Sequence, residues 1–203
     1  MLANKLGYLY IDTGAMYRAI TYTALQKGVP LADEEALLAL TLGTIIKMIP
    51  KDGEQQKIFC NGLDVTEIIR EPLINKNVSQ VAAYGKVRQE LVRMQRELAR
   101  EQNVVMDGRD AGTVILPRAE CKIFLIASLA ERAKRRYLEL KERGYQQDFS
   151  VVKTDLADRD HYDANRKASP LMPAEDAVTV DTTHLNPTEV VQEILTIIKN
   201  KRI

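Results

Sequence analysis

The chain has 203 residues, of which 45% are hydrophobic and 28% are charged, and its formal net charge is +1. This length allows one good hydrophobic core, and the charge balance gives no general attraction to nucleic acid or to a membrane. The sequence shows no run of about 18 apolar residues and no secretory leader pattern, so we expect a cytoplasmic protein. Cys60 and Cys121 have neither metal-ligand nor disulfide spacing, and we expect both to be reduced structural thiols.

The first elements in the chain are predicted to be a helix, a strand and a second helix. Gly7 is the expected C-cap of a helix that ends just before it. The short apolar run 8–11 predicts a buried strand. Asp12 or Thr13 can cap the next helix, over about 15–27.

Arg18 lies in the first turn of that second helix, where a cation opposes the helix dipole. A phosphate bound near the helix start would reverse this penalty. We therefore interpret Arg18 as a candidate phosphate ligand, and the alternative is a solvated arginine.

Residues 44–66 are predicted to form a small antiparallel sheet inserted into an α/β core. Short apolar runs alternate there with two turn signals, Asp52-Gly53 and Asn61-Gly62. In the predicted helix that follows, over about 84–102, a packing stripe recurs at helical spacing and consists of Val87, Leu91, Met94 and Leu98. We expect Met94 to be a core residue without a cofactor role.

The most informative segment runs from Val104 to Thr113. An apolar run over 103–106 ends in a turn that carries two carboxylates, a guanidinium and two glycines. In parallel sheets, ligands bind outside the carboxyl ends of the strands. Arg109 beside Asp110 offers a phosphate fork next to a hydrogen-bond acceptor. The alternative interpretation is a charged surface turn.

Two later apolar runs, over 122–126 and 177–180, also alternate with helical patterns. This order predicts an α/β fold, in which a parallel sheet is flanked by crossover helices. The last helix is predicted to begin after Asn186, with Pro187 at its first position and Glu189 completing a capping box.

A basic stretch precedes the second of these runs. Arg132 and Arg136 are i,i+4 neighbours and can reach into a cleft from one helix face, whereas Lys134 and Arg135 are expected to be solvated. Gly144 is a candidate helix end and hinge.

A third polar cluster lies in residues 158–166. Arg159, Asp163 and Arg166 are spaced i, i+4, i+7 and would share one helix face. The alternative is an ordinary ion pair on a solvated helix.

Four motifs carry a family resemblance: IDTGAMYR (11–18), MDGRDAGTVILP (106–117), ERAKRRYLEL (131–140) and DRDHYDANRKASPL (158–171). Together they resemble bacterial cytidylate kinases, in order and at natural spacing along the whole chain. The resemblance implies a P-loop kinase-like core with a small antiparallel-sheet insert and a helical lid. It also implies one kinase-like domain over 1–203, with a monophosphate-binding insert over about 44–80 and a lid over about 132–166.

One part of that family pattern is missing from the sequence. Members begin with a strand and a phosphate-binding loop, G-x-x-x-x-G-K-[ST], whose amides and lysine hold the ATP phosphates. Residues 1–203 contain no such pattern. We expect a chain that lacks the first strand and this loop, through truncation or an internal start, and whose activity is impaired.

The resemblance also implies roles for individual side chains. Arg18 and Arg109 would bind the monophosphate, while Asp110 and Arg88 would recognise the cytosine edge. Thr13 stands where the family often has serine. The sugar hydroxyls would be held by Ser79, Arg159 and Asp163, with Arg166 close to base or phosphate. Ser79 could equally be a helix cap. The catalytic cations would be Arg132, Arg136 and Arg159.

The resemblance implies transfer of a phosphoryl group from ATP to CMP or dCMP, giving CDP or dCDP, with Mg²⁺ carried by ATP. No protein metal ligand is expected, and the partners would be these nucleotides alone, bound to a monomer. The alternative is a non-catalytic CMP-binding module that has lost its ATP site. An arginine-rich nucleic-acid or protein interaction domain is disfavoured, because aromatic residues make up only 5% of the chain.

Overall fold

The computed structural model describes residues 1–50, 56–166 and 168–201. The chain divides into two compact units, and each is described by itself. Unit 1 comprises Met1–Leu116 and Lys167–Ser169, and unit 2 comprises Pro117–Arg166 and Pro170–Ile203.

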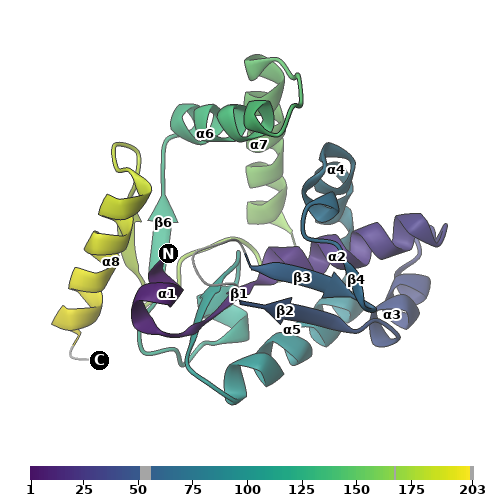
Figure 1. The fold of residues 1–203 in the computed structure, drawn as a ribbon, viewed down its shortest axis with the longest axis horizontal. Coiled ribbons are helices and arrows are strands. Elements are labelled where there is room, and N and C mark those ends of the chain that lie inside the picture. The colour runs from purple at the N-terminus through teal and green to yellow at the C-terminus, as the bar shows by residue number, and fades with distance from the viewer. Residues whose placement is uncertain (51–55, 167, 202–203) are drawn as a thin grey trace. The chain divides into compact units, whose positions relative to one another are not determined.

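The elements of unit 1 can be followed in Figure 1 from the N-terminal, purple end of the chain to the teal segments. They are α1 (Leu2–Leu6), β1 (Leu9–Asp12), α2 (Thr13–Gln26), α3 (Glu34–Leu42), β2 (Ile46–Ile49), β3 (Lys57–Cys60), β4 (Leu63–Asp64), the 3-10 helix η1 (Ile68–Arg70), α4 (Pro72–Val81), α5 (Gly85–Arg100), β5 (Val104–Asp107) and the π-helix η2 (Ala111–Ile115).

Unit 2 follows with strands and longer helices. Its elements are β6 (Ile123–Ile126), α6 (Leu129–Glu142), α7 (Phe149–Asn165), β7 (Val178–Asp181) and α8 (Pro187–Asn200).

The four predicted core strands are confirmed to within one residue at each end. β1 pairs in parallel with β5, and β6 pairs in parallel with β7. In the first pair, Asp12 lies opposite Asp107, so two carboxylates leave the same edge of the sheet. The predicted α/β class with parallel strands and flanking helices is therefore confirmed.

The sheet differs from the prediction in one respect. In the described part of the chain, β1–β5 and β6–β7 are separate two-stranded sheets, one in each unit, rather than one continuous sheet. The alternation of strands and helices specifies parallel pairing but not which strands are neighbours. Backbone groups along the unpaired strand edges need other partners, and the Gln56 side-chain amide donates to the Tyr10 carbonyl at 2.7 Å.

The predicted antiparallel insert is also confirmed. β3 pairs with β2 on one side and with β4 on the other. Asn61 and Gly62 both have positive φ, 50° and 85°, as a tight hairpin turn with two left-handed residues requires. The other predicted turn, Asp52-Gly53, lies outside the described residues.

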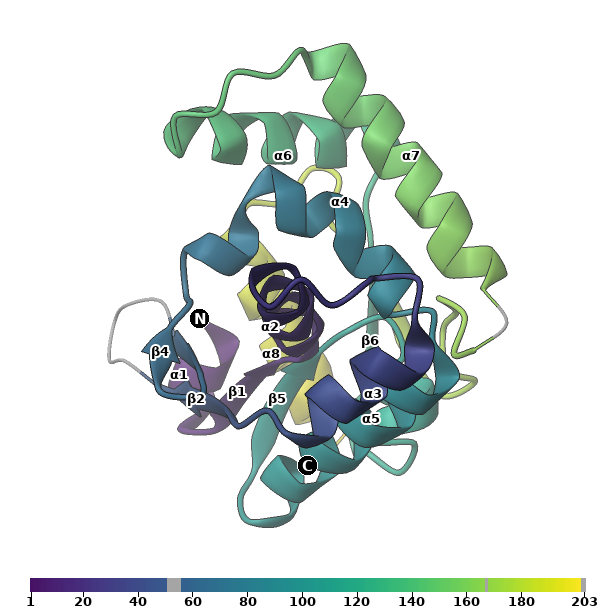
Figure 2. The same ribbon diagram turned by 90° about the vertical axis from the view of Figure 1, so that its right-hand side faces the viewer.

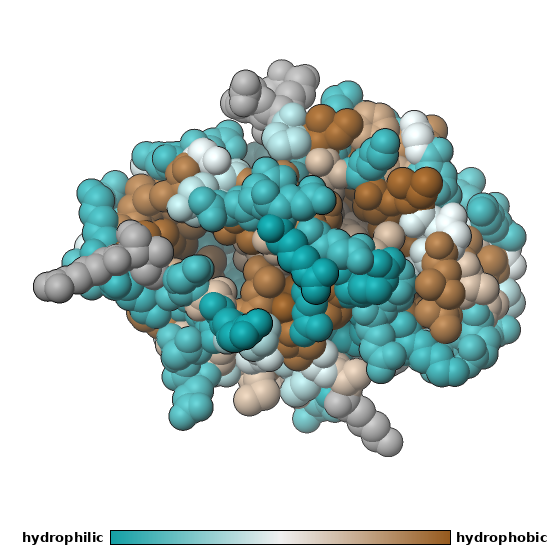
Figure 3. Space-filling view, turned by 90° about the horizontal axis from the view of Figure 1, so that it is seen from below, coloured by the Kyte–Doolittle hydropathy of each residue, from teal (hydrophilic) through white to brown (hydrophobic). Residues whose placement is uncertain are grey.

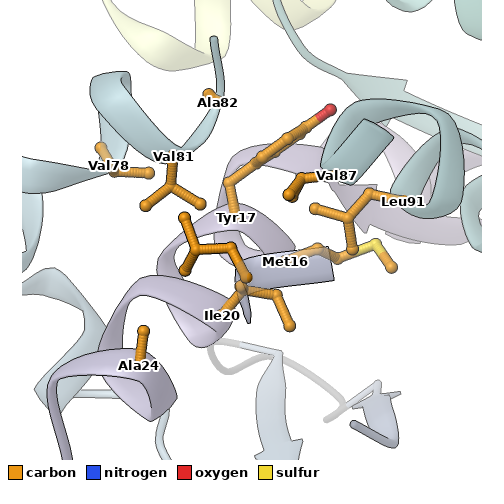
Figure 4. Close-up of a cluster of buried hydrophobic side chains, with 10 residues drawn as sticks. Met16, Tyr17, Ile20, Ala24, Val78, Val81, Ala82, Val87 and Leu91 are labelled. Atoms are coloured by element: carbon orange, nitrogen blue, oxygen red, sulfur yellow. The ribbon is translucent and has the colours of Figure 1, made fainter. Parts of the chain in front are cut away.

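The main hydrophobic core of unit 1 is organised around α2. Figure 2 looks nearly along this helix and shows α3, α4, α5 and the small antiparallel sheet around it. Its side chains Met16, Tyr17 and Ile20 pack against Val87 and Leu91 of α5, and this cluster is drawn in Figure 4. Of the predicted stripe on α5, Val87 and Leu91 are core and Met94 packs at its margin, whereas Leu98 is only partly buried and lies outside this cluster.

The helix caps predicted from the sequence are present in both units. Asp12 caps α2 by accepting a hydrogen bond from the Ala15 backbone amide at 2.8 Å, and Gly7 ends α1 in a left-handed conformation. Asn186 and Glu189 form the predicted capping box of α8. Gly144 also ends α6 with a φ of 83°, whereas its role as a hinge stays a prediction.

The side chain of Arg135 is 42% exposed, as predicted, but its guanidinium also has partners that the sequence did not indicate. Its guanidinium donates to the backbone carbonyl of Thr182 at 2.6 Å and to that of Leu185 at 3.2 Å. These contacts tie α6 to the segment that follows β7. Local spacing could not reveal them, because the acceptors lie some 50 residues away.

Apolar side chains also reach the surface. Figure 3 shows brown apolar residues on one face between teal hydrophilic ones. Scattered exposure of this kind is ordinary for a folded protein. Within the described residues, no helix is both long and apolar enough to cross a membrane.

Candidate functional site

Asp12 is the centre of a charged cluster at the carboxyl end of β1. Because β1 ends where α2 begins, this residue is both the last strand residue and the N-cap of the helix. Its Oδ2 accepts from Arg18 Nη2 at 2.9 Å and lies 3.4 Å from Arg70 Nη2. A Cβ at Gly14 would lie 3.1 Å from Arg18 Nη1, so glycine there lets the arginine approach closely. The predicted solvated arginine is therefore wrong for Arg18.

Asp107, opposite Asp12 on β5, has a perturbed acidity. Tyr10 Oη donates to its Oδ1 at 2.9 Å. Burial and then the charge of Asp12 raise the pKa of Asp107 to about 6, and burial and Asp107 raise the pKa of Tyr10. The residue as a whole is exposed, so solvent screens these effects.

Thr13 and Gly108 allow the end of β5 to lie close to the start of α2. Thr13 Oγ1 donates to the Asp107 backbone carbonyl at 2.8 Å, and a Cβ at Gly108 would lie 2.3 Å from that hydroxyl. Thr13 therefore positions the turn after β5. Arg109 in that turn is exposed, and its charge lowers the pKa of Asp107.

Arg88 and Asp110 form a buried ion pair. Their side chains are only 5% and 4% exposed. Arg88 Nη1 also donates to the Ala82 carbonyl at 3.0 Å, and its guanidinium carbon lies 5.3 Å from the centre of the Tyr17 ring. Figure 4 shows that ring passing between Ala82 and Val87. The alternative interpretation of a charged surface turn is therefore wrong for Asp110, because this residue is buried.

The π-helix η2 fixes where Asp110 lies. The Ile115 amide donates to the Asp110 carbonyl at 3.2 Å, which is the wide i→i+5 turn of a π-helix. Arg96 of α5 holds the end of this turn through the carbonyls of Val114 and Ile115, at 2.7 and 3.0 Å. Since Arg88 lies on the same helix, α5 supports both members of the buried pair.

In unit 2, Asp163 contacts both arginines of the predicted cluster, but only Arg159 lies with it in α7, because Arg166 is the C-cap of that helix. Arg166 Nη1 lies 3.4 Å from Asp163 Oδ1, and Arg159 Nε lies 3.8 Å from its Oδ2. The side chains of Arg166 and Asp163 are 5% and 4% exposed. The alternative interpretation of an ordinary ion pair on a solvated helix is therefore wrong for Arg166 and Asp163.

The two α6 arginines that were predicted to be catalytic, Arg132 and Arg136, already have acidic partners. Arg132 pairs with Asp160 of α7 and donates from Nε to the Ala127 carbonyl at 3.0 Å. Arg136 pairs with Glu139 at 2.7 Å. Ligand binding by either guanidinium would compete with these contacts.

Ser79 lies inside α4, three residues before its C-cap Ala82. The helix-cap interpretation of Ser79 is therefore wrong. Its hydroxyl is carried by a partly buried residue, and its contact with a sugar stays a prediction.

Comparison with known proteins identifies the family of the chain. The sequence profile of the cytidylate kinase family matches residues 1–200. The chain belongs to the cytidylate kinase family. Among its relatives, the cytidylate kinase of Geobacillus sp. is 52% identical over 204 residues, which span 100% of this chain and 90% of the relative. Those of Ligilactobacillus salivarius and Bacillus subtilis are both 50% identical and are covered over 89% of their length, with 99% of this chain.

The sequence interpretation missed two residues of unit 1. Arg70 reaches Asp12 from η1, and Tyr17 supports Arg88. Tyr17 had a signal, because it precedes Arg18 in a helix already assigned to the site. Arg70 lies in a stretch without any periodic or motif signal, and only the fold brings it to Asp12.

Proposed function

We propose that the chain transfers a phosphoryl group from ATP to CMP or dCMP, forming ADP and CDP or dCDP. Family membership supports this reaction class, and the relatives at about 50% identity are named cytidylate kinases. The observation that carries the choice of acceptor is the buried pair of Arg88 and Asp110. A desolvated carboxylate beside a guanidinium offers one acceptor and several donors in fixed geometry.

In this proposal, Asp110 accepts a hydrogen bond from the exocyclic amino group of cytosine, as carboxylates do when they recognise that base. Arg88 donates to the acceptor atoms of the same edge. Uracil has a carbonyl in place of the amino group, so a carboxylate there would face another acceptor. This mismatch supports a preference for CMP over UMP.

The remaining unit 1 residues would bind the phosphate and sugar. Arg18 and Arg109 supply guanidinium donors for the monophosphate, and Thr13 acts by holding the turn that carries Arg109. Ser79 contributes a hydroxyl to the sugar. Each of these roles is tested by replacing the side chain and measuring the change in nucleotide affinity.

In unit 2, Arg159, Asp163 and Arg166 would contact sugar, base or phosphate, while Arg132, Arg136 and Arg159 would neutralise charge on the transferred group. Phosphoryl transfer depends on such positioning and charge stabilisation, and on excluding water. We propose that residues 132–166 form the lid and residues 44–80 the monophosphate-binding insert of one kinase-like domain, acting as a monomer.

Mg²⁺ would enter with ATP and be held by phosphate oxygens and water. Asp12 is a poor metal ligand in this arrangement, because its Oδ1 accepts from Ala15 and its Oδ2 from Arg18. We therefore assign no protein ligand to the metal.

We further propose that residues 1–203 on their own react slowly, since they contain no G-x-x-x-x-G-K-[ST] sequence. Loss of a single preorganised donor can cost about 10²–10³ in kcat. A coupled assay with ATP, Mg²⁺ and CMP tests both claims. It compares these residues alone with the same residues joined to an N-terminal segment that carries a G-x-x-x-x-G-K-[ST] sequence. CDP formation that rises with the added segment is expected. Equal kcat contradicts the impairment, and CMP binding without CDP in either protein favours the non-catalytic module.

A further inference from the structure

Arg70 approaches the Asp12 carboxylate from a different element than Arg18 does. Arg70 ends η1, whereas Arg18 lies in α2, and both Nη2 atoms point at the same oxygen, Asp12 Oδ2, at 3.4 and 2.9 Å. The side chains are 25% and 13% exposed. Two largely desolvated guanidinium groups therefore share one carboxylate oxygen.

This arrangement leaves hydrogen-bond donors in excess. Within the residues that the structure describes, Nε of Arg18 and Nε of Arg70 are buried and have no hydrogen-bond partner. Buried donors without partners are costly. Burial lowers the pKa of Arg18, the carboxylates of Asp12 and Asp107 raise it, and repulsion by the Arg70 cation lowers it further. An anion with several acceptor oxygens would satisfy both donors and offset this repulsion.

We propose that Arg70 is a phosphate-binding residue that acts with Arg18 on the monophosphate of the acceptor nucleotide. Asp12 holds both guanidinium groups in place before the nucleotide arrives. The inference rests on the proposed function, which supplies the monophosphate. If Arg70 served only to anchor η1 to the start of α2, its loss would not distinguish a nucleotide from the nucleoside without phosphate.

That distinction gives the test. Calorimetric titration of the 203-residue chain with CMP and with cytidine compares the wild type with Arg70→Met and Arg70→Lys. A hydrogen bond to a charged group is worth about 1.5–3 kcal/mol, so CMP affinity should fall about 10- to 150-fold in Arg70→Met. Cytidine affinity should change less than about twofold. Arg70→Lys keeps the charge without the fork and should lie in between.

Arg100→Met at the exposed end of α5 is the matched control and should leave both affinities unchanged. Melting curves show whether each variant is folded, and Arg70→Lys decides if Arg70→Met is not. Equal losses for CMP and cytidine, or no loss for CMP, overturn the inference. Failure of the proposed function looks different. The wild type then binds UMP as well as CMP, or it binds no nucleotide at all. If it binds no nucleotide, both proposals fall.

Discussion

The buried pair of Arg88 and Asp110 allows stability and recognition to be separated by a double-mutant cycle. Both side chains are at most 5% exposed, and Arg88 also contacts the Tyr17 ring. Removing one partner of a buried ion pair costs about 3–5 kcal/mol, because the other charge is left desolvated. At roughly 2–4 °C per kcal/mol for a chain of this size, Asp110→Ala should melt about 6–20 °C below the wild type.

Replacing both partners by apolar residues of similar volume should behave differently. Asp110→Leu combined with Arg88→Met leaves no unpaired buried charge, so we expect it to lie within about 1 kcal/mol of the wild type. Calorimetric melting of Asp110→Leu, of Arg88→Met and of the double variant measures the three free energies of the cycle. The double variant should nevertheless lose its preference for CMP, which titration with CMP and UMP measures.

The matched control is the exposed pair of Arg93 and Glu97 on the same helix, whose side chains are 55% and 52% exposed. Glu97→Gln should cost less than about 1 kcal/mol. The reasoning is refuted if Asp110→Ala costs no more than this control. It is also refuted if the double variant is as unstable as the sum of the single variants.

Two further predictions concern the carboxyl end of β5. Gly108→Ala places a Cβ 2.3 Å from Thr13 Oγ1, so it should lower the free energy of unfolding in urea by about 1–3 kcal/mol. Adding Thr13→Ala to this variant should recover part of the loss. Purely additive effects of the two substitutions would contradict the contact. For Asp107, a folded-state pKa raised to about 6 means that the folded state binds the extra proton more tightly than the unfolded state does. This contribution to stability is present at pH 4 and is lost as the pH rises through about 6. Asp107→Asn should flatten that part of the stability profile, and an unchanged profile would contradict the assignment.

The sequence predicted most of the secondary structure because its signals are local. Four strands, the caps at Asp12 and Asn186 and the turn at Asn61-Gly62 each depend on residues a few positions apart. The pairing of strands into separate two-stranded sheets could not be predicted in this way. Strand neighbours depend on contacts between distant segments, which no periodicity encodes.

The same limit applies to the site. Arg18 and Asp110 were nominated from motifs and Arg88 from the family resemblance, and the structure gives each a defined charged partner. Arg70 was missed, and so were the carbonyl partners of Arg135, because these contacts join residues 58 and 47 positions apart in the sequence. Both arginines are recognisable only once the fold has brought their acceptors to them.

The most direct test of the central claim compares the affinities of CMP and UMP for the wild type and for Asp110→Ala, below the melting temperature of both. Loss of the acceptor for the cytosine amino group leaves a buried polar partner unpaired, at about 1–3 kcal/mol. CMP affinity should therefore fall about 5- to 150-fold, whereas UMP affinity should fall much less. If CMP and UMP weaken equally, Asp110 does not read the base, and the assignment of a cytidylate acceptor site is wrong.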